Sequence, residues 1–202
     1  MSDRKYPTIT IARTYGAGGR TIARGISEKL GIPFYDKDFI KKTAEDSGYS
    51  VEDIEREGET LSRGSKFMND FLNNAVSYKS SYDGIFEAER ETILRLAREQ
   101  DCIIVGRASN IILRSAGIPN FSIYLNASMA DRIVRARELG ESDEQDIERY
   151  IRKIDKRRAT YYKNYTGTEM NDARNYDICL DTSTIDKDRC IDLLVDLIRS
   201  RS

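Results

Sequence analysis

A glycine-rich segment near the start of the chain contains the residue types best suited to chemistry. Residues 8–21 read TITIARTYGAGGRT, a β-branched run followed by a turn with three glycines and then by a helical pattern. Gly16, Gly18 and Gly19 let successive backbone N–H groups converge on an anion at the start of the following helix. The pattern is typical of a loop that binds nucleotide phosphates, although an ordinary tight strand-to-helix turn has the same composition.

The loop departs from the common phosphate-binding motif G-x-x-x-x-G-K-[ST]. With Gly19 as the second glycine, Thr14 replaces the first glycine, Arg20 replaces the lysine and Thr21 supplies the hydroxyl. With Gly18 as the second glycine, Gly19 occupies the lysine position and the cation Arg20 lies one residue later. The sequence leaves both registers open. Because arginine keeps the charge on a wider planar head, phosphate binding is a safer expectation here than catalysis.

A second cluster of charges follows a helix that we predict over residues 142–162. Its packing stripe consists of Ile147, Ile151, Ile154, Arg158 and Tyr161. The neighbouring face carries Arg149, Arg152, Lys153, Lys156 and Arg157. In a chain whose net charge is −1, this local excess suits a polyphosphate ligand, and a solvated basic face is the alternative.

Composition restricts the chemistry that the chain can perform. Its 202 residues are 39% hydrophobic, enough for one α/β domain with a buried core. There is no histidine, which excludes Ser-His and Cys-His nucleophilic sites and argues against zinc. Cys102 and Cys179 lie in strand-like runs and Cys190 on a helical pattern, so we expect three buried, reduced thiols. Phosphoryl transfer suits the remaining side chains, because it needs positioning and charge neutralisation.

Charge and hydropathy also restrict the partners. The 33 basic and 34 acidic residues nearly cancel, so the chain has no global attraction to nucleic acid. No run approaches the roughly 20 apolar residues of a membrane span, and the first residues lack an apolar signal region. We therefore expect a cytoplasmic protein that binds a small molecule, with neither nucleic acid nor membrane as a partner.

Five short apolar runs are predicted to be β-strands. They cover residues 8–12, 33–35, 102–105, 121–125 and 176–180. Helical patterns separate them, so we expect a parallel sheet covered by helices on both faces. Ligands bind at the carboxyl ends of such strands, which are followed here by residues 15–21, 36–42, 106–107, 126–128 and 181–183.

A long segment without strand signals separates the second and third predicted strands. We interpret residues 37–100 as a helical insertion, with helices over 66–78 and 83–99. Its charged part, 52–64, is either a lid over a substrate or a solvated surface. The expected organisation is a single domain, 1–202, with a core of 1–36 and 101–202, this insertion, and a lid at about 142–166. The insertion packs on its own core or on a second copy, so a homodimer stays open.

Several segments together resemble the nucleoside monophosphate kinases, and among them the bacterial cytidylate kinase-like proteins. The segments are IARTYGAGGR at 11–20, IPFYDK at 32–37, IVGR at 104–107, YLNAS at 124–128, IDKRRATYY at 154–162 and NYDICLDTS at 175–183. Each one alone is weak, but their order and spacing are specific. The resemblance spans most of the chain.

The resemblance implies a three-layer P-loop kinase fold of the α/β class. The fold would have a five-stranded parallel sheet, an acceptor-binding helical insertion and a lid helix. The implied reaction is ATP-dependent phosphoryl transfer, with Mg²⁺, to a small phosphorylated acceptor, most naturally a nucleoside monophosphate such as CMP. The residues implied to bind the donor phosphates are Gly16, Ala17, Gly18, Gly19, Arg20 and Thr21. Thr21 would supply the hydroxyl on the magnesium side.

The resemblance also implies roles for residues further along the chain. Those implied to bind the acceptor are Asp36, Lys42, Arg107 and Asp155. Arg132 and Arg135 would lie near the point where the donor base and the lid meet. The implied catalytic cations are Arg20, Arg152 and Arg157, which would neutralise charge on the transferring phosphoryl group.

One departure from the family pattern bears on specificity. Cytidylate kinases carry an aspartate on each side of the Gly-Arg pair where this chain has Val105 and Ala108. Without a carboxylate to accept a hydrogen bond from the cytosine amino group, we expect poor discrimination for cytosine. The alternative function is a nucleotide-binding or sensing protein that keeps the fold but transfers nothing, as the displaced loop cation would permit. A purely structural domain would require the loop, Arg107 and the basic face of the helix over 142–162 to be coincidences.

Overall fold

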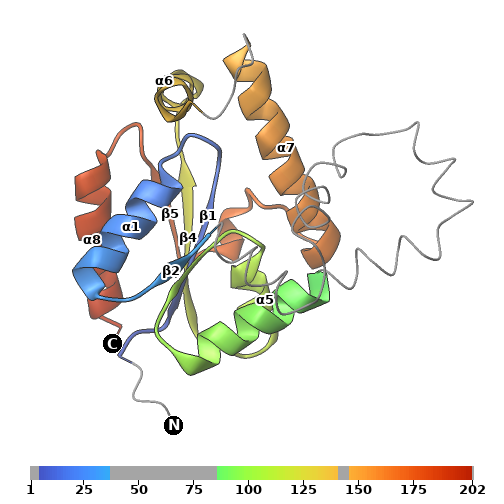
Figure 1. The fold of residues 1–202 in the computed structure, drawn as a ribbon, viewed down its shortest axis with the longest axis vertical. Coiled ribbons are helices and arrows are strands. Elements are labelled where there is room, and N and C mark those ends of the chain that lie inside the picture. Colours follow the sequence, from blue (N-terminus) through green and yellow to red (C-terminus); the bar gives the residue numbers. More distant parts are fainter. Residues whose placement is uncertain (1–4, 37–85, 141–145, 202) are drawn as a thin grey trace, which may run out of the picture.

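The computed structural model describes residues 5–36, 86–140 and 146–201 (Figure 1). The strands are β1 (Thr8–Arg13), β2 (Phe34–Tyr35), β3 (Ile103–Val105), β4 (Asn120–Asn126) and β5 (Ile178–Asp181). The helices are α1 (Gly19–Leu30), α5 (Ser109–Ser115), α6 (Met129–Leu139), α7 (Ile147–Thr166) and α8 (Lys187–Arg199), with a 3₁₀ turn η1 (Ala173–Asn175). Residues 86–99 are also helical.

The strands form one sheet in the order β2-β3-β1-β4-β5, and every neighbouring pair is parallel. The glycine-rich loop leaves the central strand, where Ile9 lies opposite Ile103 on one side and Phe121 on the other. This confirms the five predicted strands and the parallel sheet. A parallel sheet gathers the loops that follow its strands at one edge.

Helices cover both faces of the sheet, which confirms the three layers (Figure 1). On one face, α1 and α8 pack against β1 and β3 through residues such as Ile26, Leu194 and Ile9, all fully buried. On the other face, the helix over residues 86–99 and α5 bury Leu96 and Leu113 against the strands. Each large aliphatic side chain buried in this way contributes about 1.5–3 kcal/mol, so the sheet is a rigid platform for the loops at its edge.

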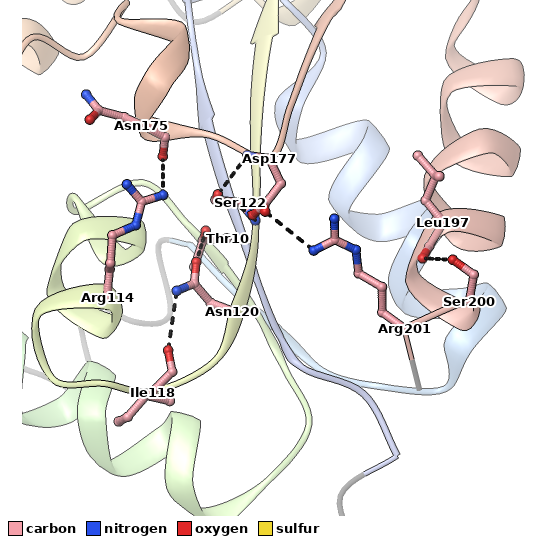
Figure 2. A network of polar contacts seen from close by, with 10 residues as sticks. All are labelled: Thr10, Arg114, Ile118, Asn120, Ser122, Asn175, Asp177, Leu197, Ser200 and Arg201. Carbon is pink, nitrogen blue, oxygen red and sulfur yellow. Dashed lines mark hydrogen bonds and ion pairs between the residues drawn. The ribbon is translucent and has the colours of Figure 1, made fainter.

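A network of polar contacts fixes β4 and β5 at their amino ends, away from the glycine-rich loop (Figure 2). The N–H and hydroxyl of Ser122 donate to Asp177 Oδ2 at 2.8 and 2.6 Å, and Arg201 Nη1 lies 3.4 Å from Asp177 Oδ1. Arg114 Nη2 donates to the carbonyl of Asn175 at 3.0 Å. Burial alone would raise the pKa of Asp177, but the hydrogen bonds from Ser122 and the Arg201 charge lower it. The charged carboxylate thereby holds the edge strand in register.

The helix predicted over residues 142–162 is α7, which is named the lid helix for its predicted role and has different bounds. The carboxylate of Asp146 caps α7 by accepting from the N–H of Arg149 at 3.0 Å. The helix continues to Thr166 and ends where Gly167 takes a left-handed conformation, with φ +71°. That backbone conformation strongly favours glycine, so the glycine and not the last apolar residue sets the end.

The cysteine expectation is wrong at one of three positions. Cys102 and Cys190 are buried, but Cys179 is exposed, and all three are free thiols. Side chains of a strand alternate between its two faces, and on the edge strand β5 only the side chain of Leu180 is buried. An apolar run therefore does not guarantee that each of its residues lies in the core.

Several expectations fall outside the described residues. They concern Lys42, the helix over 66–78 and the charged stretch 52–64, while the helix predicted over 83–99 is seen over 86–99. The division into core, insertion and lid stays a prediction. None of the described helices is both long and apolar enough to cross a membrane.

Candidate functional site

A cavity of about 360 Å³ lies at the carboxyl ends of β1 and β3, with α7 as one wall. Its cationic lining consists of Arg13, Arg20, Arg107, Arg157 and Arg158. Its aromatic lining consists of Tyr15, Tyr150, Tyr161 and Tyr162. Asp36 is the only acid among the described residues that line the cavity. Five guanidinium groups facing one carboxylate suit a ligand that carries more than one negative charge.

The glycine-rich loop leads directly from β1 into α1 beside this cavity. Gly16 and Gly18 have φ of +80° and +77°, a backbone region that favours glycine. A Cβ atom on Gly16 would lie 2.9 Å from the backbone of Arg132, so the loop also needs glycine there for close packing. The structure thus confirms why residues 16 and 18 are glycines.

The amino end of α1, like that of the short helix α5, lacks the side-chain cap that α6, α7 and α8 have. Ser128, Asp146 and Asp186 cap α6, α7 and α8 with their side chains, whereas α1 follows Gly18 and has no side-chain cap. The first N–H groups of a helix lack partners within it and carry a partial positive charge. An anion at the start of α1 would supply what a capping side chain supplies elsewhere.

Three side chains hold the loop by donating hydrogen bonds to its carbonyl groups. Arg132 Nε donates to the carbonyl of Tyr15 at 2.6 Å, and Arg135 Nη1 donates to that of Gly16 at 3.3 Å. The hydroxyl of Thr182 donates to the carbonyl of Ala17 at 3.1 Å. The structure therefore places Arg132 and Arg135, expected near the donor base, in contact with the loop backbone. These three donors hold the loop backbone at the carbonyl groups of residues 15, 16 and 17.

Asp36, which follows β2, joins two of the cavity arginines. One carboxylate oxygen forms an ion pair with Arg20 Nε, and the other lies 3.4 Å from Arg13 Nη2. The Asp36 and Arg13 side chains are each 14% exposed. Asp36, expected to bind the acceptor, is thus already paired with two cations that face the same space.

The loop after β3 has an unusual backbone. Gly106, Arg107 and Ala108 have φ of +90°, +56° and +53° in succession. A non-glycine residue in this region costs roughly 1–3 kcal/mol, so packing must impose the conformation. Arg107 lines the cavity, as the sequence predicts. Strain of this kind is typical of backbone that positions a functional side chain.

The buried carboxylate of Glu89 holds the Arg107 side chain in position. Glu89, whose side chain is 1% exposed, has Oε1 at 3.2 Å from Arg107 Nε, an ion pair without the geometry of a directed hydrogen bond. Tyr161 donates its hydroxyl to Glu89 Oε2 at 2.6 Å, and its ring lies under the Arg107 guanidinium at 5.4 Å. Sequence reasoning missed Glu89. An acid within the apolar repeat of the helix over residues 86–99 was the available signal.

The lid helix contributes Arg157 and Arg158 to the cavity. Arg158 was expected on the packing stripe, and it is indeed largely enclosed: it lies 5.6 Å from the Tyr15 ring, and its Nη1 donates to the Arg13 carbonyl at 3.4 Å. Burial lowers the pKa of Arg158, while Asp155 and Asp36 act in the opposite sense. By contrast, Arg152 is exposed and bonds to Glu148 of its own helix at 2.6 and 2.9 Å.

Not all of the predicted residues meet in one place. The cavity brings together Arg20, Asp36, Arg107 and Arg157. The described residues that line it do not include the other predicted loop residues, which are Gly16, Ala17, Gly18, Gly19 and Thr21. Asp155 instead accepts from the N–H of Tyr15 and pairs with Arg132. Arg13 and Arg158 also line the cavity, although no sequence pattern predicts a chemical role for either. A charged residue that ends a buried strand, as Arg13 does, was the signal for the first of them.

A second hollow of about 390 Å³ lies between α6 and the start of α8. Its basic residues are Arg135 and Lys187, and its acids are Asp131, Glu138, Asp186 and Asp188. A Cβ atom on Gly18 would lie 3.8 Å from the Lys187 side chain, so one residue that lines this hollow also lies beside the glycine-rich loop.

The described residues suit magnesium that is also bound by a phosphate ligand. Among the described residues, no three His, Cys, Asp or Glu side chains converge as a metal site. Magnesium commonly takes one or two protein oxygens and completes its shell with substrate phosphates and water. Thr21, in the first turn of α1 and exposed, offers a hydroxyl of that kind.

A parallel sheet of this order, with a glycine-rich loop between its central strand and the first helix, defines a protein of the P-loop kinase fold. The chain belongs to the cytidylate kinase-like family, whose model matches residues 8–184. Membership implies nucleotide binding, and it confirms the resemblance seen in the sequence. A named relative is the cytidylate kinase of Methanothrix thermoacetophila, 27% identical over 196 residues that cover 95% of this chain and 98% of that protein.

Two solved structures share the fold. An uncharacterized protein from Eubacterium ventriosum has a TM-score of 0.70 at 24% identity, over 96% of this chain and 99% of that chain. Shikimate kinase from Acinetobacter baumannii, in complex with shikimate, has a TM-score of 0.54 at 16% identity, over 98% of this chain and 95% of that chain. At these identities the likeness shows the architecture alone.

Proposed function

We propose that the protein transfers the γ-phosphoryl group of ATP to a nucleoside monophosphate, with CMP as the first candidate. The observation that carries this proposal is that one residue connects the glycine-rich loop to the arginine-lined cavity. Arg20 belongs to both, since it lies in the first turn of α1 and lines the cavity. A donor on the loop would therefore present its terminal phosphate to an acceptor inside the cavity.

The donor phosphates would bind the uncapped first turn of α1. Its N–H groups and the Arg20 guanidinium supply positive charge where the triphosphate needs it. The base of the donor would extend into the second hollow, past Arg135 and Lys187. When bound, Mg²⁺ would neutralise and orient the phosphate oxygens, and Thr21 is the residue that we expect to hold it.

The acceptor phosphate would bind Arg107, with Lys42 as a further predicted contact, and Arg157 would neutralise charge on the transferring phosphoryl group. The floor next to Arg107 consists of Val105 and Ala108, which offer no carboxylate to a base. A site without a buried polar partner discriminates weakly between bases that differ in polar groups. We therefore expect cytosine and uracil nucleotides to be used at similar rates.

The chemistry requires no histidine and no general base. In the transfer, the bond from the γ-phosphorus to the bridging oxygen of ADP breaks, and a bond to an acceptor phosphate oxygen forms. That oxygen is already ionised at neutral pH, so no proton must be removed. The protein has only to align the two phosphates and neutralise their repulsion, which is the role that arginines perform in phosphoryl transfer.

The test is magnesium-dependent ADP release from ATP with CMP, dCMP, UMP and other nucleoside monophosphates, beside a control without acceptor. We expect ADP release that depends on the acceptor, with CMP and UMP within about tenfold of each other. Measurable ATP binding without turnover on any acceptor would favour the alternative of a nucleotide sensor. One feature favours that alternative, namely that Arg20 pairs with Asp36. Failure to bind ATP at all would contradict both functions.

A further inference from the structure

Arg13 reaches the cavity through a passage left by two glycines. It is the last residue of β1, and its side chain runs between the glycine-rich loop and the loop after β3. A Cβ atom on Gly19 would lie 2.9 Å from Arg13 Cγ, and a Cβ on Gly106 would overlap Nη1. Both glycines therefore make room for the arginine.

The guanidinium group of Arg13 ends inside the cationic cluster. Asp36 Oδ1, at 3.4 Å, is the carboxylate that it contacts, and Asp36 also pairs with Arg20. Burial, then the nearby charge of Arg158, lowers the pKa of Arg13 to about 9, against the opposing effect of Asp36. Enclosing a cation among other cations is unfavourable, so the arrangement is suited to an added anion.

Arg13 lies where it can replace the lysine that the glycine-rich loop lacks. The common motif places a lysine beside the terminal phosphates of the donor, and this chain has Gly19 or Arg20 at that point. Arg20 is directed toward Asp36 through its Nε. Arg13 enters from beneath Gly19 and faces the space between the loop and Arg107, where a phosphoryl group would pass from donor to acceptor.

We propose that Arg13 is a catalytic residue that supplies the cation missing from the phosphate loop. This inference rests on the function proposed above. Arg13 donates hydrogen bonds to the non-bridging oxygens of the transferred phosphoryl group and neutralises its charge, while the bond to ADP breaks and the bond to the acceptor forms. It neither gives up nor receives a proton.

The test compares Arg13→Met and Arg13→Lys with Arg24→Met, a matched change at an exposed residue of α1. Turnover is measured beside the affinities for ATP and for an adenosine–cytidine dinucleotide joined by five phosphates, which spans both sites. Removing one such donor costs roughly 100-fold in turnover or more. We expect that loss in Arg13→Met, a pentaphosphate affinity about 30-fold lower and an ATP affinity within about threefold of the unaltered protein. The lysine variant should recover part of the loss, and Arg24→Met should resemble the unaltered protein.

A second variant separates this role from a merely structural one. If Arg13 only balanced the charge of Asp36, the double variant Arg13→Met with Asp36→Asn would regain pentaphosphate affinity, which would overturn the proposal. We expect no recovery of pentaphosphate affinity in the double variant. The double variant should unfold at a temperature similar to that of the Asp36→Asn variant.

The outcomes also separate this inference from the function on which it rests. An active unaltered protein with an equally active Arg13→Met variant would contradict the role of Arg13 alone. An inactive unaltered protein that binds the pentaphosphate no better than ATP would contradict the proposed function, and the role of Arg13 with it.

Discussion

The backbone N–H of Tyr15, in the glycine-rich loop, donates a hydrogen bond of 2.7 Å to Asp155 Oδ1 in the lid helix α7. Arg132 completes the junction, because it pairs with Asp155 and donates to the carbonyl of Tyr15. The ring of Tyr15 also packs edge-on against Tyr150 at 5.5 Å. The loop and the lid helix are therefore joined directly, and Asp155 acts on the loop.

Asp155→Asn should damage turnover more than acceptor binding. The amide oxygen can still accept from Tyr15, but the charge that faces the buried Arg132 is lost, which should lower the free energy of unfolding by roughly 1–3 kcal/mol. Turnover should fall because the loop is less firmly held, whereas the acceptor KM should change little. Chemical denaturation and steady-state kinetics measure the two effects. Asp196→Asn, at an exposed position of α8, is the control. An increase in the acceptor KM at unaltered stability would instead make Asp155 a substrate ligand.

Glu89→Gln should weaken acceptor binding through Arg107. The substitution keeps the size of the side chain and leaves Tyr161 a partner, but it removes the charge opposite Arg107. An arginine held in a strained backbone without its ion pair loses its fixed position, so we expect the acceptor KM to rise about tenfold, equivalent to about 1.4 kcal/mol. Steady-state kinetics with the acceptor varied will measure this. The ATP KM should not change, and a parallel rise in both would indicate general unfolding.

Ala108→Asp should create preference for cytosine. Aspartate adopts the left-handed backbone of residue 108 more readily than most side chains, so the fold should tolerate the change. The new carboxylate would accept from the amino group of cytosine and face the carbonyl of uracil, which should raise the CMP to UMP ratio of kcat/KM by about tenfold or more. Ala108→Asn, without the charge, should give a smaller preference. Equal use of CMP and UMP by the aspartate variant would contradict the position of the acceptor base beside residue 108.

The pH dependence of anion binding should report Arg13. The charged groups that face it are Asp36, Arg20, Arg107 and Arg158. Burial and then the nearby charge of Arg158 lower the pKa of Arg13 to about 9, against the effect of Asp36, and a bound anion favours the charged form. Pentaphosphate affinity should therefore fall as the pH rises through 9, with uptake of a proton on binding. Calorimetry in two buffers of different ionisation enthalpy measures the uptake. Arg13→Met should abolish it, and persistence of the uptake in that variant would attribute it to another group.

Sequence patterns were sufficient to predict the architecture. Strands such as β1 and β4 are short, largely apolar runs that are buried on both faces, and the helices between them repeat their apolar residues at helical spacing. The main differences lie at element ends, as at Gly167, and on the edge strand, where Cys179 is exposed. Ends and edges depend on caps and neighbours, which periodicity does not encode.

The candidate site was only partly predictable. Gly18, Arg107 and Arg157 belong to local motifs, so the sequence indicated them. Glu89 and Arg13 are buried charges whose partners lie far along the chain, and nothing in their local sequence shows that those partners meet. Asp155 was recognised by its position in a motif, but its contact with Tyr15 depends on how α7 packs on the loop.

The most direct test of the central claim is to follow the γ-phosphate itself. The protein is incubated with ATP labelled at that position, magnesium and CMP, and the products are separated, with Arg157→Ala beside it. We predict that the label appears in CDP, and that its rate of appearance falls about 100-fold in the variant, because Arg157 lines the cavity where charge develops. Label that stays in ATP, or that passes only to inorganic phosphate, with CMP and with every other nucleoside monophosphate would contradict phosphoryl transfer between nucleotides.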